Sequence, residues 1–280
     1  MISTSFTFRP DRKIAQEFVR VLQKMAVYAR KLKRYPKGKQ SKAIHETRVL
    51  IKRLRALLWF AKQTIPPTKL TQAKLHLQRA SHLLAPQRDL IVMQSVLKKI
   101  SRKMSVPERQ KILIRISSTS DFRQAADEKF GPSLCQAIAL LLETINQIEQ
   151  EAKTCSEWPS PSHRLARAFN AAKKAGKKAL QEGKAVSFHT WRKKTKRLLY
   201  QLQLIQAAPG YRMARTIKRV DKLQGILGDY HDSVVVQDRM RQSPPPKMPR
   251  SLVKDSVKLL KKRKHRLQKK KPGKRPSGSN

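Results

Sequence analysis

Two segments of the chain, 144 residues apart, carry the same pattern of charged side chains. Residues 45–54 and 189–198 both read His-x-x-Arg-x-x-x-Lys-Arg-Leu, where x is any residue. About 35 residues beyond each segment a second motif follows, Arg88-Asp89 after the first and His231-Asp232 after the second, at an offset of 143 residues. Because the two motifs recur in the same order and at nearly the same offset, they predict a chain built from two copies of one unit.

The residue types and their periodicity predict an all-α fold. Ala, Leu, Lys, Arg and Gln, which favour helices, are abundant, whereas only 9 of the 280 residues are Gly. Apolar residues recur at three- and four-residue spacing along most of the chain, as they do on the buried side of a helix. We expect eight helices, at about 11–34, 41–63, 68–104 with an interruption at Pro86, 121–154, 163–180, 188–207, 211–241 and 251–268.

These helices fall into two groups of four. Residues 11–154 form the first group and residues 163–268 the second, and the Pro- and Ser-containing segment 155–162 is the expected linker between them. Together with the repeat, this order predicts two tandem four-helix bundles related by internal duplication. Residues 269–280, rich in Lys, Pro, Gly and Ser, are expected to form a disordered basic tail.

The repeated motif places its cations along one side of a helix. At 100° per residue, an arc of about 80° contains four side chains of the first copy, His45, Arg48, Lys52 and Arg55. The second copy repeats the stripe with His189, Arg192 and Lys196. Because like charges three or four positions apart repel one another, a stripe present in both copies favours a binding face over a merely solvated basic surface.

The charge balance predicts an anionic partner. The chain has 64 Lys and Arg against 18 Asp and Glu, a net charge of +46, and such a surplus repels itself unless a polyanion binds. Residues 247–280 carry only +13 of this charge, so the basic character belongs mainly to the folded part. Residues 121–157 have a net charge of −4 and should face away from the polyanion or clamp a basic neighbour, unless they are simply a solvated acidic face.

Membrane, secreted and metal-binding classes find no support in the sequence. The longest uninterrupted apolar run, residues 137–142, is far too short to span a bilayer, and residues 1–10 lack the apolar segment of a secretory signal. Cys135 and Cys155 do not have the spacing of a zinc site. We therefore expect reduced, packed thiols, an intracellular protein, and no membrane partner, metal or cofactor.

Catalytic motifs are also missing. The sequence contains no Gly-x-x-x-x-Gly-Lys-Ser/Thr phosphate loop and no convincing nucleophile or acid–base pair, and His231-Asp232 lacks the further ligands of a metal phosphohydrolase. Residues 149–153 read Glu-x-Glu-x-Lys, the signature of the CYTH triphosphate-tunnel enzymes, but here the motif continues an apolar helix instead of lying on a strand. We expect no enzymatic activity.

At these motifs the chain resembles the CHAD domain family (conserved histidine α-helical domain). Both motif helices and both later motifs match, whereas Ala85-Pro86 replaces the usual Gly region and Leu199 stands where an Arg is common. The resemblance covers about residues 10–268. It implies two four-helix bundles related by a pseudo-twofold axis, which bind inorganic polyphosphate in a basic cavity between them without hydrolysing it.

The resemblance and the helix positions assign the polyphosphate-binding residues. The first copy supplies His45, Arg48, Lys52, Arg53, Arg55 and Arg88, and the second supplies His189, Arg192, Lys193, Lys196, Arg197 and His231. Membership of the predicted seventh helix adds Arg219 and Lys222. Phosphates should raise the pKa of the three histidines, so that affinity grows as pH falls, although His231 has packing as an alternative role. Asp89 and Asp232 are expected to orient neighbouring Lys or Arg side chains.

The alternative function is general binding of RNA or DNA by the same basic surface. Aromatic residues make up only 6% of the chain, and the basic helices are not interleaved with them as in single-strand binders. This favours inorganic polyphosphate as the partner. We expect a cytoplasmic location, and the resemblance implies association with polyphosphate granules.

Overall fold

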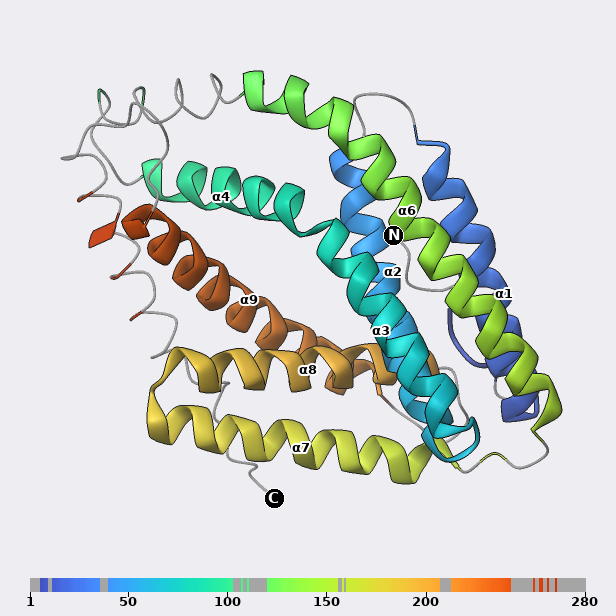
Figure 1. The fold of residues 1–280 in the computed structure, drawn as a ribbon. Coiled ribbons are helices and arrows are strands. Elements are labelled where there is room, and N and C mark those ends of the chain that lie inside the picture. Colours follow the sequence, from blue (N-terminus) through green and yellow to red (C-terminus); the bar gives the residue numbers. More distant parts are fainter. Residues whose placement is uncertain are drawn as a thin grey trace.

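The computed structural model describes residues 6–9, 12–35, 40–102, 120–155, 158, 160–206 and 213–242, with isolated positions between 107 and 110 and between 254 and 265. This part of the chain contains helices and no strand, which confirms the predicted all-α fold. The elements are α1 (Ile14–Lys33), α2 (Gln40–Phe60), the 3-10 helix η1 (Ala61–Gln63), α3 (Pro67–Leu83), α4 (Ala85–Ser101), α6 (Ser120–Thr154), α7 (Pro161–Glu182), α8 (Ala185–Ile205) and α9 (Ala214–Gln242) (Figure 1).

The observed helices follow the predicted ones closely, including the interruption near Pro86. The predicted helix 68–104 is two helices, α3 and α4, which meet at Leu84. Pro86 lies in the first turn of α4, where its missing N–H removes no hydrogen bond from the helix. The predicted helix 251–268 and the predicted tail 269–280 lie outside the described residues, apart from the isolated positions.

Local signals set both ends of α7. The Ser160 side chain accepts a hydrogen bond from the Ser162 backbone N–H at 3.3 Å, and Pro161 occupies the first position of the helix. The helix ends at Gly183, which has φ +65° and donates its N–H to the Ala179 carbonyl at 3.0 Å. Glycine adopts this left-handed conformation without the strain of a Cβ. The chain therefore turns sharply from α7 into α8.

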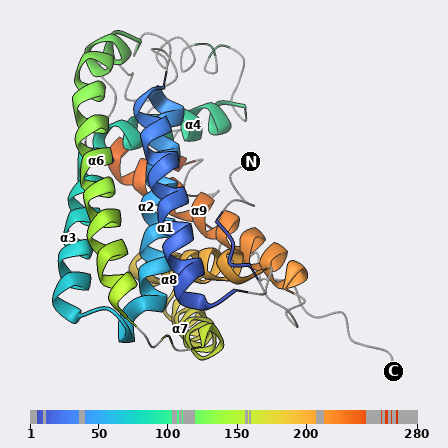
Figure 2. The same ribbon diagram turned by 90° about the vertical axis from the view of Figure 1, so that its right-hand side faces the viewer.

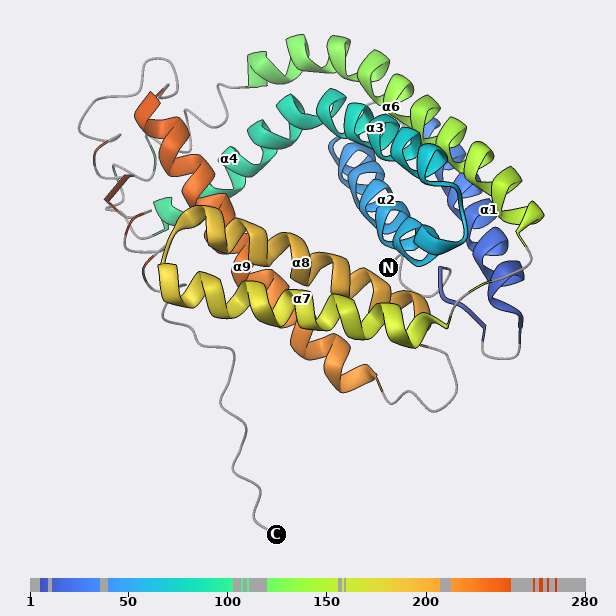
Figure 3. The same ribbon diagram turned by 60° about the horizontal axis from the view of Figure 1, so that its bottom comes forward.

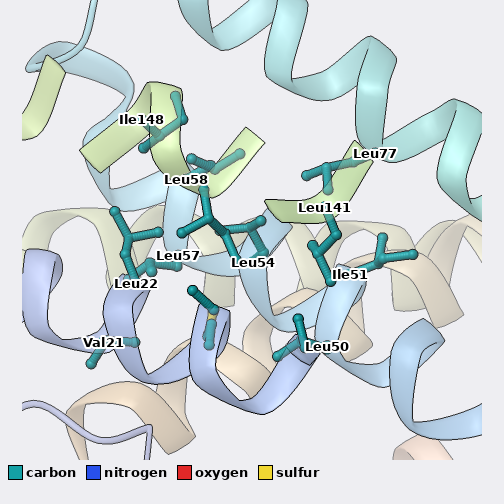
Figure 4. Close-up of a cluster of buried hydrophobic side chains, with 14 of the residues drawn as sticks. Val21, Leu22, Leu50, Ile51, Leu54, Leu57, Leu58, Leu77, Leu141 and Ile148 are labelled. Atoms are coloured by element: carbon teal, nitrogen blue, oxygen red, sulfur yellow. The ribbon is translucent and has the colours of Figure 1, made fainter. Parts of the chain in front are cut away.

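The first group consists of α1, α2, α3 and α6, which run side by side (Figures 1 and 2). Its core is the largest hydrophobic cluster among the described residues and contains fully buried side chains such as Leu22, Leu54, Leu57 and Leu141 (Figure 4). Removing this much apolar surface from water is the main stabilising contribution to such a bundle. The first group therefore forms a rigid support for α2.

The second group consists of α7, α8 and α9, with α8 packed against both of the others. Its buried clusters are smaller, and one of them joins Phe188, Trp191 and Tyr230. Gly176 on α7 lets the Trp191 ring approach closely, since a Cβ at Gly176 would lie 2.9 Å from that ring. The glycine thus serves helix packing, because α7 meets α8 at this point.

Contacts between the groups join segments that correspond in the sequence repeat. α2 packs against α8, which carries the second copy of the same motif, and α4 packs against α9, which carries the second copy of the later motif (Figure 3). Phe8 adds a link, because its backbone N–H donates to the Leu204 carbonyl at 2.6 Å. Contacts between matched helices agree with a pseudo-twofold arrangement, and the tandem duplication itself stays a prediction.

The acidic segment pairs with one basic neighbour on another helix, in line with one of its predicted roles. On α6, Glu151 pairs with Lys69 of α3 at 3.0 Å. Glu149 pairs with Lys153 of the same helix at 2.8 Å, so the Glu-x-Glu-x-Lys sequence lies on a helix, as expected. No helix in the described part of the chain is both long and apolar enough to cross a membrane.

Candidate anion-binding site

The two motif helices meet at a cationic pocket. It has a volume of about 480 Å³ and is lined by α2, η1, α3 and α8. Figure 3 shows α2, α3 and α8 near one another. Seven of the predicted residues line it: Lys52, Arg55, His189, Arg192, Lys193, Lys196 and Arg197. Lys62 and Lys74 add two cations that the sequence analysis did not select, and no carboxylate belongs to the described lining. The pocket therefore concentrates positive charge.

The pKa of Lys52 shows the effect of burial among these positive charges. Burial, followed by the charges of Lys196 and Arg48, lowers its pKa from 10.5 to about 6. Both causes act against the ammonium form, because a buried charge loses hydration and like charges repel. Without a ligand, Lys52 is therefore largely neutral at pH 7.

The pKa of Lys196, the matched residue of the second copy, is also lowered. Burial and the charge of Arg192 lower its pKa to about 8, although the carboxylate of Asp232 acts in the opposite direction. Burial likewise lowers the pKa of Arg48 and of Arg192. An anion in the pocket would counter these effects most directly for Lys52, Arg192 and Lys196, which line it, whereas Arg48 lies outside the lining.

Arg88 connects the two groups beside the pocket. Its Nη2 lies 3.1 Å from Asp232 Oδ1 on α9, and its Nη1 lies 3.1 Å from Asp89 Oδ1 on its own helix. Both aspartates thus contact Arg88, and their orienting role stays a prediction. Arg48 is fixed separately, because its Nη1 donates to the Ser81 carbonyl at 3.0 Å.

His189 and His231 form a direct pair between α8 and α9. Their Nδ1 atoms are 3.2 Å apart, and their ring centroids are 4.6 Å apart. Burial and the charge of Arg192 lower the pKa of His231 to about 3, and burial lowers the pKa of His189 as well. Both rings are thus neutral near pH 7, with one Nδ1 donating to the other. This contact supports the packing role that the sequence left open for His231.

His45 does not repeat the pairing seen for its counterpart. Its side chain is exposed on α2 and is not part of the pocket lining. The surrounding protein and the charges of Lys52 and Lys196 nevertheless lower its pKa. His45 therefore lies within the electrostatic reach of the cationic cluster, at its edge.

Arg53 lies between aromatic rings instead of in the pocket. Its guanidinium is 5.5 Å from the Phe6 ring centroid and 5.8 Å from the Tyr200 ring centroid. Such contacts hold a cation against the ring face. Arg53 and its counterpart Arg197 thus differ, since Arg197 lines the pocket.

Arg219 and Lys222 lie away from the described pocket. Both side chains are exposed on α9, and neither belongs to the lining. Nine residues separate Lys222 from His231, which corresponds to about half a turn around a helix. A position on α9 is therefore not enough to bring these two cations to the pocket.

Two aromatic residues in the pocket wall were missed by the sequence analysis. Trp59 and Tyr200 both line the pocket. The helical spacing contained the signal, because Trp59 follows Lys52 by seven residues and Tyr200 follows Lys196 by four, and both intervals keep a side chain on the same side of a helix. Only the low aromatic content of the whole chain was considered at the level of sequence, so these two residues were not assigned to the site.

The arrangement suits recognition of anions. Guanidinium groups donate paired hydrogen bonds to phosphate oxygens, and ammonium groups add mobile positive charge. Within the described part of the chain, no three His, Cys, Asp or Glu side chains come together in a metal-binding group. The geometry therefore offers cations and donors for several phosphates.

Comparisons with known proteins agree with this architecture. A model of the CHAD domain family matches residues 18–241. Among solved structures, the chain is similar to the crystal structure of the CHAD domain from the plant Ricinus communis, with a TM-score of 0.74 and 17% sequence identity. The alignment covers 95% of this chain and 91% of that one. No curated protein matches the chain.

Proposed function

The chain belongs to the CHAD domain family, and on that premise we propose that it binds inorganic polyphosphate in the pocket between α2 and α8 without hydrolysing it. Polyphosphate binding is a property of this family. One observation carries the proposal: Lys52, Lys196, Arg48 and Arg192 are clustered, and burial together with neighbouring positive charges lowers the pKa of each of them. This crowding is unfavourable in the free protein and becomes favourable beside an anion.

The proposed ligand fits the shape of the charge distribution. Cations line the pocket from Lys193 on α8 to Lys62 and Lys74 on η1 and α3. A linear chain of phosphates presents oxygens along its whole length, so it can contact many of these groups at once. As a cytoplasmic polyphosphate-binding protein, the chain would be free to associate with polyphosphate granules.

General binding of nucleic acid by the exposed cations is the competing function. Much of the positive charge, Arg219 and Lys222 included, lies outside the pocket, and a diffuse basic surface would attract RNA or DNA through their phosphates. The two functions differ in which residues matter. Pocket binding depends on the buried cations, whereas surface binding depends on total charge.

A pair of fourfold variants, each of which removes four basic side chains, separates these functions. The pocket variant replaces Arg48, Lys52, Arg192 and Lys196 with Ala, and the control variant replaces the exposed Arg30, Arg34, Lys173 and Lys177 with Ala. Circular dichroism confirms that each variant is helical, and a milder variant, Lys52→Met, replaces the pocket set if it unfolds. We expect the pocket variant to lose polyphosphate binding and the control to retain it. Equal losses would favour nonspecific surface binding, as would a larger loss on deleting residues 269–280.

A further inference from the structure

We propose that the pocket accepts nucleoside polyphosphates, with the phosphates among the cations and the base against Trp59 and Tyr200. The inference rests on the proposed function, because the same cations hold the phosphates. It adds a ligand class that joins an aromatic base to a short phosphate chain, such as a nucleoside triphosphate.

The composition of the pocket wall motivates the proposal. Besides its cations, the pocket is lined by Trp59, Tyr200, Leu58, Leu70 and Ala56. Inorganic polyphosphate has no apolar part, so it gains nothing from these side chains. A nucleobase stacks on aromatic rings whatever its identity, because every base has a π face. The aromatic and aliphatic part of the wall therefore matches the portion of a nucleotide that polyphosphate lacks.

Neighbouring side chains hold Trp59 in place at the pocket. The Arg164 guanidinium lies 5.5 Å from the Trp59 ring centroid, and the Phe60 ring meets Trp59 edge-on with centroids 6.2 Å apart. Trp59 is half-buried and still contributes to the lining. A ring fixed in this way loses little freedom when a ligand stacks on it.

The spacing along the helices suits a nucleotide. Trp59 follows Lys52 by seven residues, which places it on the same side of α2 and about 10 Å further along the axis. This distance resembles that between the base and the outer phosphates of a nucleoside triphosphate. On α8, Tyr200 follows Lys196 by four residues, which is about 6 Å.

The size of the pocket favours a mononucleotide over a nucleic acid strand. Its volume of about 480 Å³ lies within the range of small-molecule sites. A strand would need a continuous groove with further stacking rings along it. Among the described lining residues, the aromatic rings other than the imidazole of His189 are Trp59 and Tyr200.

Calorimetry with the full chain tests the inference. ATP, inorganic tripolyphosphate, long-chain polyphosphate and oligo(A) are titrated at one near-physiological salt concentration with a chelator, so that Mg²⁺ does not screen the phosphates. The variants are Trp59→Leu, the conservative Trp59→Phe, and the control Phe169→Leu, which changes an exposed aromatic residue on α7 outside this pocket. Circular dichroism checks that each variant remains folded.

We expect Trp59→Leu to weaken ATP binding about tenfold, or ~1.4 kcal/mol, and to leave tripolyphosphate binding unchanged. Trp59→Phe should recover part of the ATP affinity, and Phe169→Leu should match the wild type. ATP should also quench tryptophan fluorescence less in Trp59→Leu, which reports contact with that ring.

Three results would overturn the inference. If Trp59→Leu changed neither ATP nor tripolyphosphate binding, or weakened both equally, the base would not contact the ring, while polyphosphate binding by the wild type would leave the proposed function intact. Dependence on Trp59 for oligo(A) but not for ATP would assign the rings to RNA instead. Failure of long-chain polyphosphate to bind would reject the proposed function, and with it this inference.

Discussion

Lys52 on α2 and Lys196 on α8 line the same pocket, although 144 residues separate them in the sequence. They occupy matched positions in the two repeats. After burial, the charge of Lys196 is the next cause that lowers the pKa of Lys52 to about 6. The fold thus brings the same position of both repeats into one cluster, whose charges an anion would stabilise.

Binding of polyphosphate should take up protons from solution. An anion beside Lys52 favours the ammonium form, so the pKa rises from about 6 on binding. Between that value and the higher pKa of the complex, binding should transfer about one proton to the protein. Affinity should therefore decrease as pH rises through this window. Calorimetry at about pH 7 in two buffers of different ionisation enthalpy measures the uptake.

The same experiment with Lys52→Met supplies the control for proton uptake. This variant keeps the apolar stem but cannot accept a proton, so most of the uptake should disappear. An unchanged uptake in Lys52→Met would show that other groups, such as Lys196 or the histidines, are responsible.

Lys52→Met should also stabilise the free protein. The unfolded state holds a proton on Lys52 up to about pH 10.5, whereas the folded state loses it above about pH 6. Stability of the wild type therefore rises with pH across this range. The variant should have a free energy of unfolding about 1–3 kcal/mol higher at neutral pH, with a smaller gain near pH 10. Urea denaturation at both pH values measures this, and a destabilised variant would argue against an unfavourable buried amine.

The residues that the sequence placed correctly are those governed by helix geometry. The stripe of Lys52, Arg55, Arg192 and Lys196 could be predicted because spacing along one helix fixes which side chains share a side. The family resemblance implied a basic cavity between the two groups but did not specify that α2 packs against α8. Spacing also contained Trp59 and Tyr200, but the overall scarcity of aromatic residues hid them.

Contacts between side chains on different helices could not be predicted from the spacing of residues along the sequence. The contact of His189 with His231 depends on how α8 crosses α9, and the bridge from Arg88 to Asp232 depends on how α4 meets α9. Arg53 was assigned to the site with Arg197 because the motif repeats. It packs instead against Phe6, a residue of the N-terminal segment that has no counterpart in the second copy.

Glu17 should be a stabilising residue remote from binding. It is 1% exposed and accepts hydrogen bonds from Arg9 and Arg20. Burial alone would raise its pKa, but these hydrogen bonds outweigh burial and lower the pKa from 4.5 to about 2. This contribution is complete above about pH 4.5 and is lost as pH falls toward 2.

Replacing Glu17 with Gln should therefore lower the free energy of unfolding by about 2–3 kcal/mol at pH 7. The difference from the wild type should shrink near pH 3, and polyphosphate affinity should not change. Urea denaturation at the two pH values measures the effect. A difference independent of pH would mean that shape, and not charge, accounts for the loss.

Gly176 should tolerate no side chain, in contrast to Gly225. A Cβ at Gly176 would lie 2.9 Å from the Trp191 ring, whereas one at Gly225 would meet nothing within 4 Å. Gly176→Ala should destabilise the protein by about 1–3 kcal/mol through overpacking. Gly225→Ala should stabilise it by about 0.5–1 kcal/mol, because Ala favours the helix. Thermal unfolding of both variants tests the pair, and equal shifts would contradict the close packing of α7 on α8.

The most direct test of the central claim is competition at matched charge and near-physiological salt. Long-chain polyphosphate, single-stranded RNA and duplex DNA compete for the full chain, and the salt dependence of each affinity is measured, because phosphate-dominated binding changes steeply with salt. A shaped pocket predicts that polyphosphate binds about 100-fold more tightly, or ~2.7 kcal/mol. Equal affinities with equal salt slopes would contradict the pocket and describe a nonspecific polycation.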